Sequence, residues 1–100
     1  MKPKIGDAVL VEWEDSYGCS SSWQSIDPSG QPRVLICESV GWIVQRTAKC
    51  IVLVPHMTAR DDVAQRQGCG DMTIPTASII RLTQLSLKGQ KRAISRPFSC

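Results

Sequence analysis

The chain has 100 residues, of which 42% are hydrophobic and 21% are charged, a composition typical of one soluble globular domain. No apolar stretch approaches the roughly 18 residues of a membrane-spanning helix, and the N-terminus lacks the apolar segment of a secretory signal, so we expect a cytoplasmic protein. The formal net charge of +3 is unevenly distributed. Residues 1–80 contain seven basic and nine acidic side chains, whereas residues 81–100 contain five basic and none that are acidic. The basic character therefore belongs to the C-terminal end.

Five β-strands are predicted, at residues 7–15, 34–45, 50–55, 71–75 and 79–85. In the first strand, Val9, Val11 and Trp13 alternate with other side chains, which is the period of a strand with one buried face. Gly41 interrupts the second strand and indicates a bend, a bulge or a close approach of another backbone. The third strand is apolar on both faces and is predicted to be central. Its outer cover would be the tail, the long loop or another subunit.

Two long polar connections and a tail complete the chain. Residues 16–33 are rich in Ser, Gly and Pro, and residues 27–30 fit a type I turn. The second connection, residues 56–70, contains either two helical turns at residues 58–67 or a mobile loop. Residues 88–100 are basic and poor in apolar side chains, which predicts a flexible C-terminal tail. The expected organisation is a small β-barrel domain at residues 1–87 followed by this tail.

The order of the predicted elements resembles the SH3-like barrel. Five short antiparallel strands, a second strand bent at a glycine, and a single turn at residues 76–78 before the last strand all fit that architecture. The fold expected from this resemblance is mainly β, a small five-stranded SH3-like antiparallel barrel. An OB-like barrel is the structural alternative, although that fold usually includes a helix.

The whole chain also resembles a type of small uncharacterised protein of tailed bacteriophages and prophages. The resemblance rests on four stretches, at residues 11–16, 39–42, 51–55 and 68–75. It brings no assigned activity. It implies only that the protein is made in the cytoplasm of an infected bacterial host.

The candidate binding residues lie in the two connections. In the first, a carboxylate, a hydroxyl and two aromatic rings occur close together, at Asp15, Ser16, Tyr17 and Trp23. These groups suit a polar ligand or a partner, although Trp23 capping one end of the barrel, with local turn hydrogen bonds at Asp15, is the plainer alternative.

The second connection supplies the other candidates, His56, Gly68, Cys69 and Asp71. Glycines on both sides of Cys69 allow backbone N–H groups to approach a ligand closely, and they equally suit an ordinary hairpin or bulge.

Neither a metal site nor an active site is expected. Cys19, Cys50, Cys69 and His56 show no Cys-x-x-Cys or His-x-x-x-His spacing, so we expect no metal and no cofactor. A hydrolase using Cys69 and His56 would need a third, orienting group and an oxyanion site. The five cysteines are expected to be reduced, with Cys37 and Cys50 acting as small core residues.

The function expected from these observations is that of a non-enzymatic, phage-encoded binding module. It would bind a host protein or a small polar ligand, as a homo-oligomer that hides the second apolar face of the third strand. One alternative is nucleic-acid binding through the basic tail, with Lys88, Lys91, Arg92 and Arg96 on phosphates. Another is sequestration of a nucleotide signal of host defence.

Overall fold

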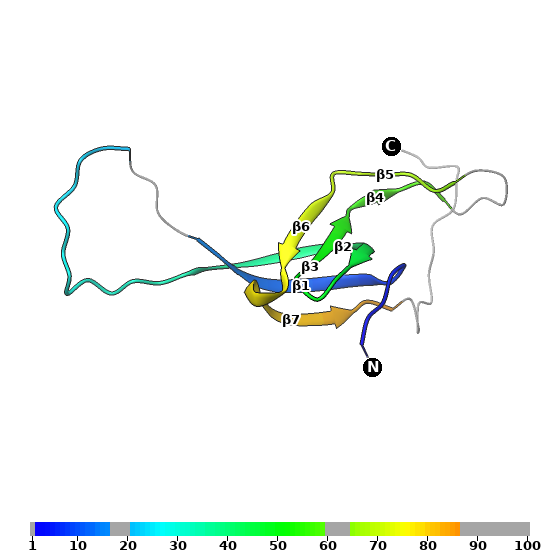
Figure 1. Cartoon of the computed structure of the whole chain (residues 1–100), viewed down its shortest axis with the longest axis horizontal. Helices are drawn as coiled ribbons and strands as arrows, with labels where there is room; N and C mark the ends of the chain where they lie inside the picture. Colours follow the sequence, from blue (N-terminus) through cyan, green and yellow to red (C-terminus); the bar gives the residue numbers. More distant parts are fainter. Residues whose placement is uncertain (1, 17–20, 60–64, 87–100) are drawn as a thin grey trace, which may run out of the picture.

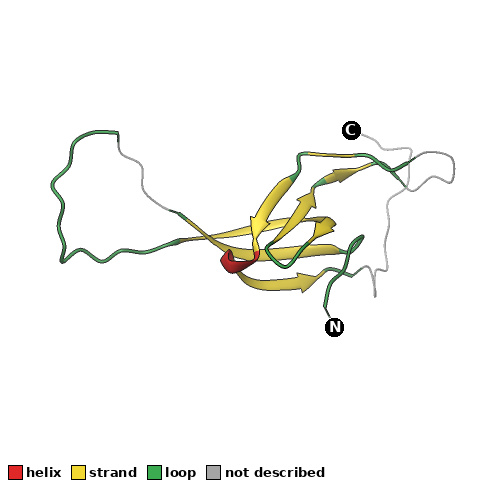
Figure 2. Ribbon diagram, in the orientation of Figure 1, coloured by secondary structure: helices red, strands yellow, loops and turns green. Residues whose placement is uncertain are grey.

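The computed structural model describes residues 2–16, 21–59 and 65–86. Within these residues the elements are β1 (Ala8–Asp15), β2 (Leu35–Arg46), β3 (Cys50–Val54), β4 (His56–Met57), β5 (Gly68–Cys69), β6 (Met72–Pro75), the 3₁₀ turn η1 (Thr76–Ser78) and β7 (Ile79–Gln84). No helix in this part of the chain has the length and apolar character needed to cross a membrane. The mainly β fold and all five predicted strands are confirmed (Figures 1 and 2).

The main sheet has five antiparallel strands in the order β6-β3-β2-β1-β7, and β4 pairs with β5 in a separate two-stranded sheet. A closed barrel is not formed, because β6 and β7 remain the two edges of the main sheet. The three residues of η1 carry the chain from one edge strand to the other without any pairing between them. A hollow of about 330 Å³ lies between Ile51 of β3, Thr76 of η1 and the β7 residues Ile79 and Leu82.

The twelve-residue strand β2 belongs to both halves of the sheet. It pairs with β1 through residues 35–42 and with β3 through residues 42–46, so it bends between its two partners. Gly41 is buried at this bend, and a Cβ atom there would lie 2.8 Å from the carbonyl oxygen of Val54. The predicted close approach of another backbone at Gly41 is therefore confirmed.

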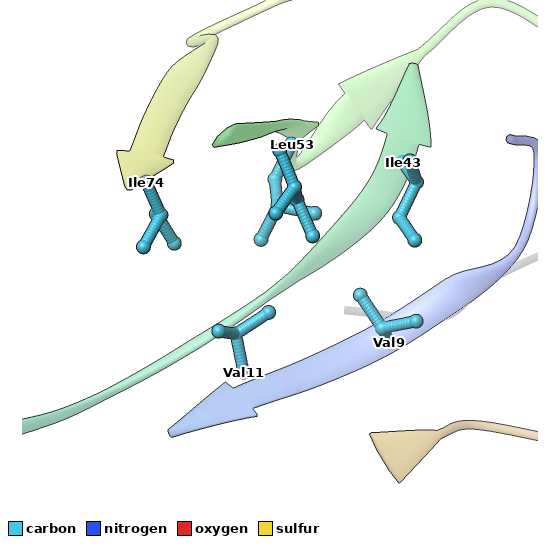
Figure 3. Packing of buried hydrophobic residues seen from close by; sticks show 6 residues of the cluster. Val9, Val11, Ile43, Leu53 and Ile74 are labelled. Carbon is cyan, nitrogen blue, oxygen red and sulfur yellow. The ribbon is translucent and has the colours of Figure 1, made fainter. Parts of the chain in front are cut away.

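The core fills the concave side of the bent sheet. Six aliphatic side chains are buried there: Val9, Val11, Ile43, Ile51, Leu53 and Ile74. Figure 3 shows Ile43, Leu53 and Ile74 pointing from β2, β3 and β6 towards Val9 and Val11 of β1. Burial of each such side chain stabilises the fold by about 1.5–3 kcal/mol relative to full exposure.

The central position of β3, between β2 and β6, is confirmed. Its second face is partly covered within the chain, because Val54 is buried and its methyl groups lie against Gly68 of β5. Cys50 and Val52 on the same face are half-buried. The two apolar faces of β3 therefore give no support for a second subunit, and the exposed apolar side chains have to be sought elsewhere.

Candidate functional site

The ends of β1 and β2 and the loop between them form an extended arm. We define the β1–β2 arm as residues 14–16 and 21–36. Figure 1 shows this part of the chain (cyan) leading away from the main sheet. The Cα radius of gyration is 18.7 Å, against about 13 Å for a compact domain of 100 residues. The arm therefore does not fold back onto the sheet.

Large apolar side chains are exposed along the whole arm, at Trp23, Ile26, Val34, Leu35 and Ile36. Trp23 and Ile26 are more than nine-tenths exposed. The alternative prediction that Trp23 caps one end of a barrel is therefore wrong. Apolar surface gathered on one element marks an interaction site more often than a singly exposed side chain does.

The arm is also acidic. It carries Glu14, Asp15 and Asp27 against the single base Arg33, and no Lys or Arg occurs between residues 5 and 32. Glu12, just inside the sheet, forms an ion pair with Arg81 of β7, with Nε and Oε2 3.3 Å apart. An apolar arm with this charge suits a partner whose surface is apolar and basic.

Asp27 organises the predicted turn of the arm. Its carboxylate accepts hydrogen bonds from the hydroxyl of Ser29 at 2.6 Å and from the N–H of Ser29 at 2.9 Å. The N–H of Gly30 donates to the carbonyl oxygen of Asp27 at 3.1 Å. The bond from the Ser29 hydroxyl, followed by the one from its N–H, lowers the pKa of Asp27, because both favour the ionised carboxylate. The charge at this turn is thus retained in moderately acidic solution.

The strands β4 and β5 bring three predicted site residues together. His56 lies opposite Cys69, and Met57 lies opposite Gly68. These four residues, with Thr58 and Gln67, line a hollow of about 360 Å³. The hollow is within the range of small-molecule sites.

Thr58 continues the β4–β5 pairing. Its N–H donates to the carbonyl oxygen of Gln67 at 2.8 Å, and its hydroxyl accepts from the Gln67 N–H at 2.8 Å. Residues 60–64 of the alternative helix lie outside the described residues, and residues 58–59 and 65–67 at its ends are not helical. The predicted helical turns are therefore not found in the part that the structure describes.

The predicted site residues fall into two separate groups. Asp15, Ser16 and Trp23 belong to the β1–β2 arm, whereas His56, Gly68 and Cys69 line the hollow beyond the opposite end of the sheet (Figure 1). Asp71 is exposed after Gly70, whose φ of 76° forms the turn into β6, and it does not line the hollow. Tyr17 lies outside the described residues, as do Lys88, Lys91, Arg92 and Arg96.

Among the described residues, His56 and Cys69 have no hydrogen-bonded partner that would activate them. Both side chains are exposed, and neither makes a hydrogen bond within the described residues, so nothing there orients the imidazole or activates the thiol. The same part of the chain holds no cluster of three His, Cys, Asp or Glu side chains that fits a metal ion. Cys37, Cys50 and Cys69 are free thiols. The described part of this hollow is a candidate binding site.

A third feature lies within the paired stretch of β1 and β2. Trp13 of β1 packs against the core, and its indole N–H donates to the hydroxyl of Ser39 at 3.0 Å. The Ser39 hydroxyl is 3.8 Å from the sulfur of Met72 in β6. Beside this contact is a hollow of about 210 Å³ lined by Ser39, Val40, Leu53, Pro55, Gly70 and Met72.

The residues that the sequence analysis missed are the apolar ones of the arm and of the outer face of β2. Leu35, Ile36 and Val40 follow a strand pattern, and the sequence alone did not single them out as exposed. The signal that could have revealed them is strand length. Because β2 has twelve residues and β3 only five, half of β2 has no described neighbour on one side. Comparison of the chain with protein-family models, curated proteins and solved structures gives no match.

Proposed function

We propose that the chain is a non-enzymatic binding module that binds a partner protein through the β1–β2 arm. The observation that carries this proposal is the exposure of Trp23, Ile26, Leu35 and Ile36 on one acidic element. A tryptophan that leaves solvent at an interface is a common energetic hot spot, and apolar arms without a partner are a liability in solution. The partner surface should be apolar and basic.

Two resemblances of the chain support the fold and the cellular context in this proposal. The strand order β6-β3-β2-β1-β7 and the single turn η1 before β7 support an SH3-like architecture that is open between its edge strands. The resemblance to phage proteins supports action inside a bacterial host, on a host protein. Self-association stays a prediction, which the acidic charge of the arm does not support.

Photo-crosslinking from the arm tests the proposal. With p-benzoylphenylalanine in place of Trp23, we expect one discrete adduct in host cells, and none with the same group in place of Ile80, an exposed residue of β7. Trp23→Ser should weaken binding to the captured protein by about 30-fold, the loss of one hot spot. Ile80→Ser is the matched control and should bind normally. The same adducts from both positions, or unchanged binding by Trp23→Ser, would contradict the proposal.

A second candidate function is favoured by the hollow between β4 and β5. Its volume and its mixture of imidazole, thiol and backbone groups suit a small polar ligand, the class to which nucleotide signals of host defence belong. Native mass spectrometry of protein purified from infected cells should show a retained small mass that His56→Ala loses and Ser29→Ala keeps. A protein of bare mass from such cells would exclude this candidate. Nucleic-acid binding by the tail stays a prediction without a described residue to support it.

A further inference from the structure

Among the described residues, no strand pairs with one backbone edge of the first half of β2. Residues 35–41 pair with β1 on one side, and pairing with β3 starts only at Trp42. The N–H of Ile43 donates to Asp7 at 3.0 Å, and its carbonyl accepts from Gly6 at 2.8 Å, so Ile43 bonds towards β1. Backbone groups alternate in direction along an antiparallel strand. The N–H and C=O groups of Ile36, Glu38 and Val40 therefore point to the open side, where they can accept another strand.

The side chains along this edge form a simple pattern of apolar, acidic and apolar. Ile36 is 55% exposed, Val40 is 60% exposed, and Glu38 between them is exposed as well. The hollow of about 210 Å³ beside Met72 adjoins Val40 and leaves space next to this edge. In strand addition, backbone hydrogen bonds give affinity, and the side chains along the edge select the added strand.

The C-terminal segment of the chain carries the complementary pattern. Ile94, Arg96 and Phe98 alternate along the sequence as apolar, basic and apolar. If these side chains share the face of Val40, Glu38 and Ile36, then Arg96 lies opposite Glu38 and an apolar residue lies opposite each apolar residue. Pro97, which has no N–H, then falls at a position whose backbone points away from β2, where a strand tolerates proline. A second copy of the same edge would instead add a like-charged Glu38 to an already acidic arm.

The direction and length of the chain also fit this placement. β7 and β2 both run antiparallel to β1, and β7 ends at Gln84 opposite Val9. A chain that returns antiparallel to β2 therefore meets Val40 first and Ile36 last, the order in which Ile94 and Phe98 occur. The crossing from β7 to the open side of β2 covers three strand spacings, about 14 Å. The nine residues 85–93 span at most about 30 Å, which is sufficient.

We propose that residues 94–98 dock in the same molecule as an added strand on the open edge of β2. Arg96 pairs with Glu38, Ile94 lies at Val40 and Phe98 lies at Ile36. The bound segment extends the half of the sheet that holds the β1–β2 arm, and it covers apolar side chains at the base of that arm. The basic C-terminal segment is thus a ligand of its own domain. This inference does not depend on the partner of the arm or on the ligand of the β4–β5 hollow.

Hydrogen exchange of the full-length chain, read by NMR at the amides of Ile36, Glu38 and Val40, tests the docking. We expect these amides to be protected, and Arg96→Glu to accelerate their exchange by about tenfold or more because Glu38 then faces a like charge. Glu38→Arg should have the same effect, and the double variant Arg96→Glu/Glu38→Arg should regain protection. Lys88→Glu makes the same charge change outside the paired segment and should leave exchange as in the wild type.

Three outcomes would overturn the proposal. Unprotected amides at Ile36, Glu38 and Val40 in the wild-type chain would mean that the edge is free. Protection that Arg96→Glu and Lys88→Glu affect equally would show only a general effect of charge. Protection that disappears on dilution would assign the added strand to a second molecule and not to the same chain.

Discussion

Replacing Gly41 with valine is expected to unfold the protein. The missing Cβ position of Gly41 is 2.8 Å from the carbonyl oxygen of Val54 and 3.1 Å from its carbonyl carbon, and both are backbone atoms of the central strand β3. Backbone atoms of a paired strand cannot move aside as the end of a flexible side chain does. Gly41→Ala should therefore cost about 1–3 kcal/mol of the free energy of unfolding. Gly41→Val should cost more, enough to unfold a small domain of marginal stability.

The sign of the change in unfolding free energy distinguishes the effect of the close contact with β3 from the effect of local strand propensity. Valine is a better strand residue than glycine, so propensity alone would predict a gain of about 1 kcal/mol. Urea denaturation followed by circular dichroism measures the change. Gly6→Ala is the control, because Gly6 has a φ of 96° and nothing within 4 Å of its missing Cβ, so its cost of about 1–2 kcal/mol is purely conformational. A Gly41→Val protein as stable as the wild type would contradict the close approach of β2 and β3.

Much of the fold could be predicted because strand periodicity and turn residues are local signals. The alternation around Val9 and Val11, the turn that begins at Asp27 and the short turn before β7 each depend on neighbouring residues. The openness of the sheet could not be predicted in this way. It depends on whether β6 and β7, which are joined by only three residues, come close enough to pair, and this distance is set by the curvature of the whole sheet.

The candidate site could be predicted only in part for a related reason. Sequence analysis placed His56, Gly68 and Cys69 in one connection, and the pairing of β4 with β5 brings them to one hollow. It did not show that Asp15 lies at the other end of the sheet and Trp23 beyond that end, because that separation follows from strand directions. Burial was the property that was hardest to predict. Leu35 and Ile36 are apolar residues in a strand, as core residues are, yet they lie beyond Trp42, where the pairing of β2 with β3 begins.

The bend of β2 links the stability of the core to the binding surfaces. Because β2 turns towards β3 at Gly41, residues 35–41 pair with no described strand on that side and continue into the arm. Ile43 stabilises this bend by packing in the core. Its side chain is 0% exposed and lies opposite Leu53 of β3, while its N–H is bonded to Asp7 before β1. Loss of its packing should therefore loosen both the core and the base of the arm.

Ile43→Ala is expected to lower the free energy of unfolding by about 2–5 kcal/mol, because it removes three buried carbon atoms and leaves a cavity between β1, β2 and β3. Ile43→Val should cost about 0.5–1.5 kcal/mol. Ile80→Ala on β7, where the side chain is 54% exposed, should stay within about 0.5 kcal/mol of the wild type. Urea denaturation with an unchanged m-value measures these differences. Equal losses for Ile43→Ala and Ile80→Ala would show that the core does not lie on the concave face of the sheet. A larger loss of stability for Ile43→Ala than for Ile43→Val and Ile80→Ala would show that packing of Ile43 stabilises the bend at the base of the arm. Substitutions at the exposed Trp23 then leave this packing unchanged, so their effect on binding can be measured in a folded protein.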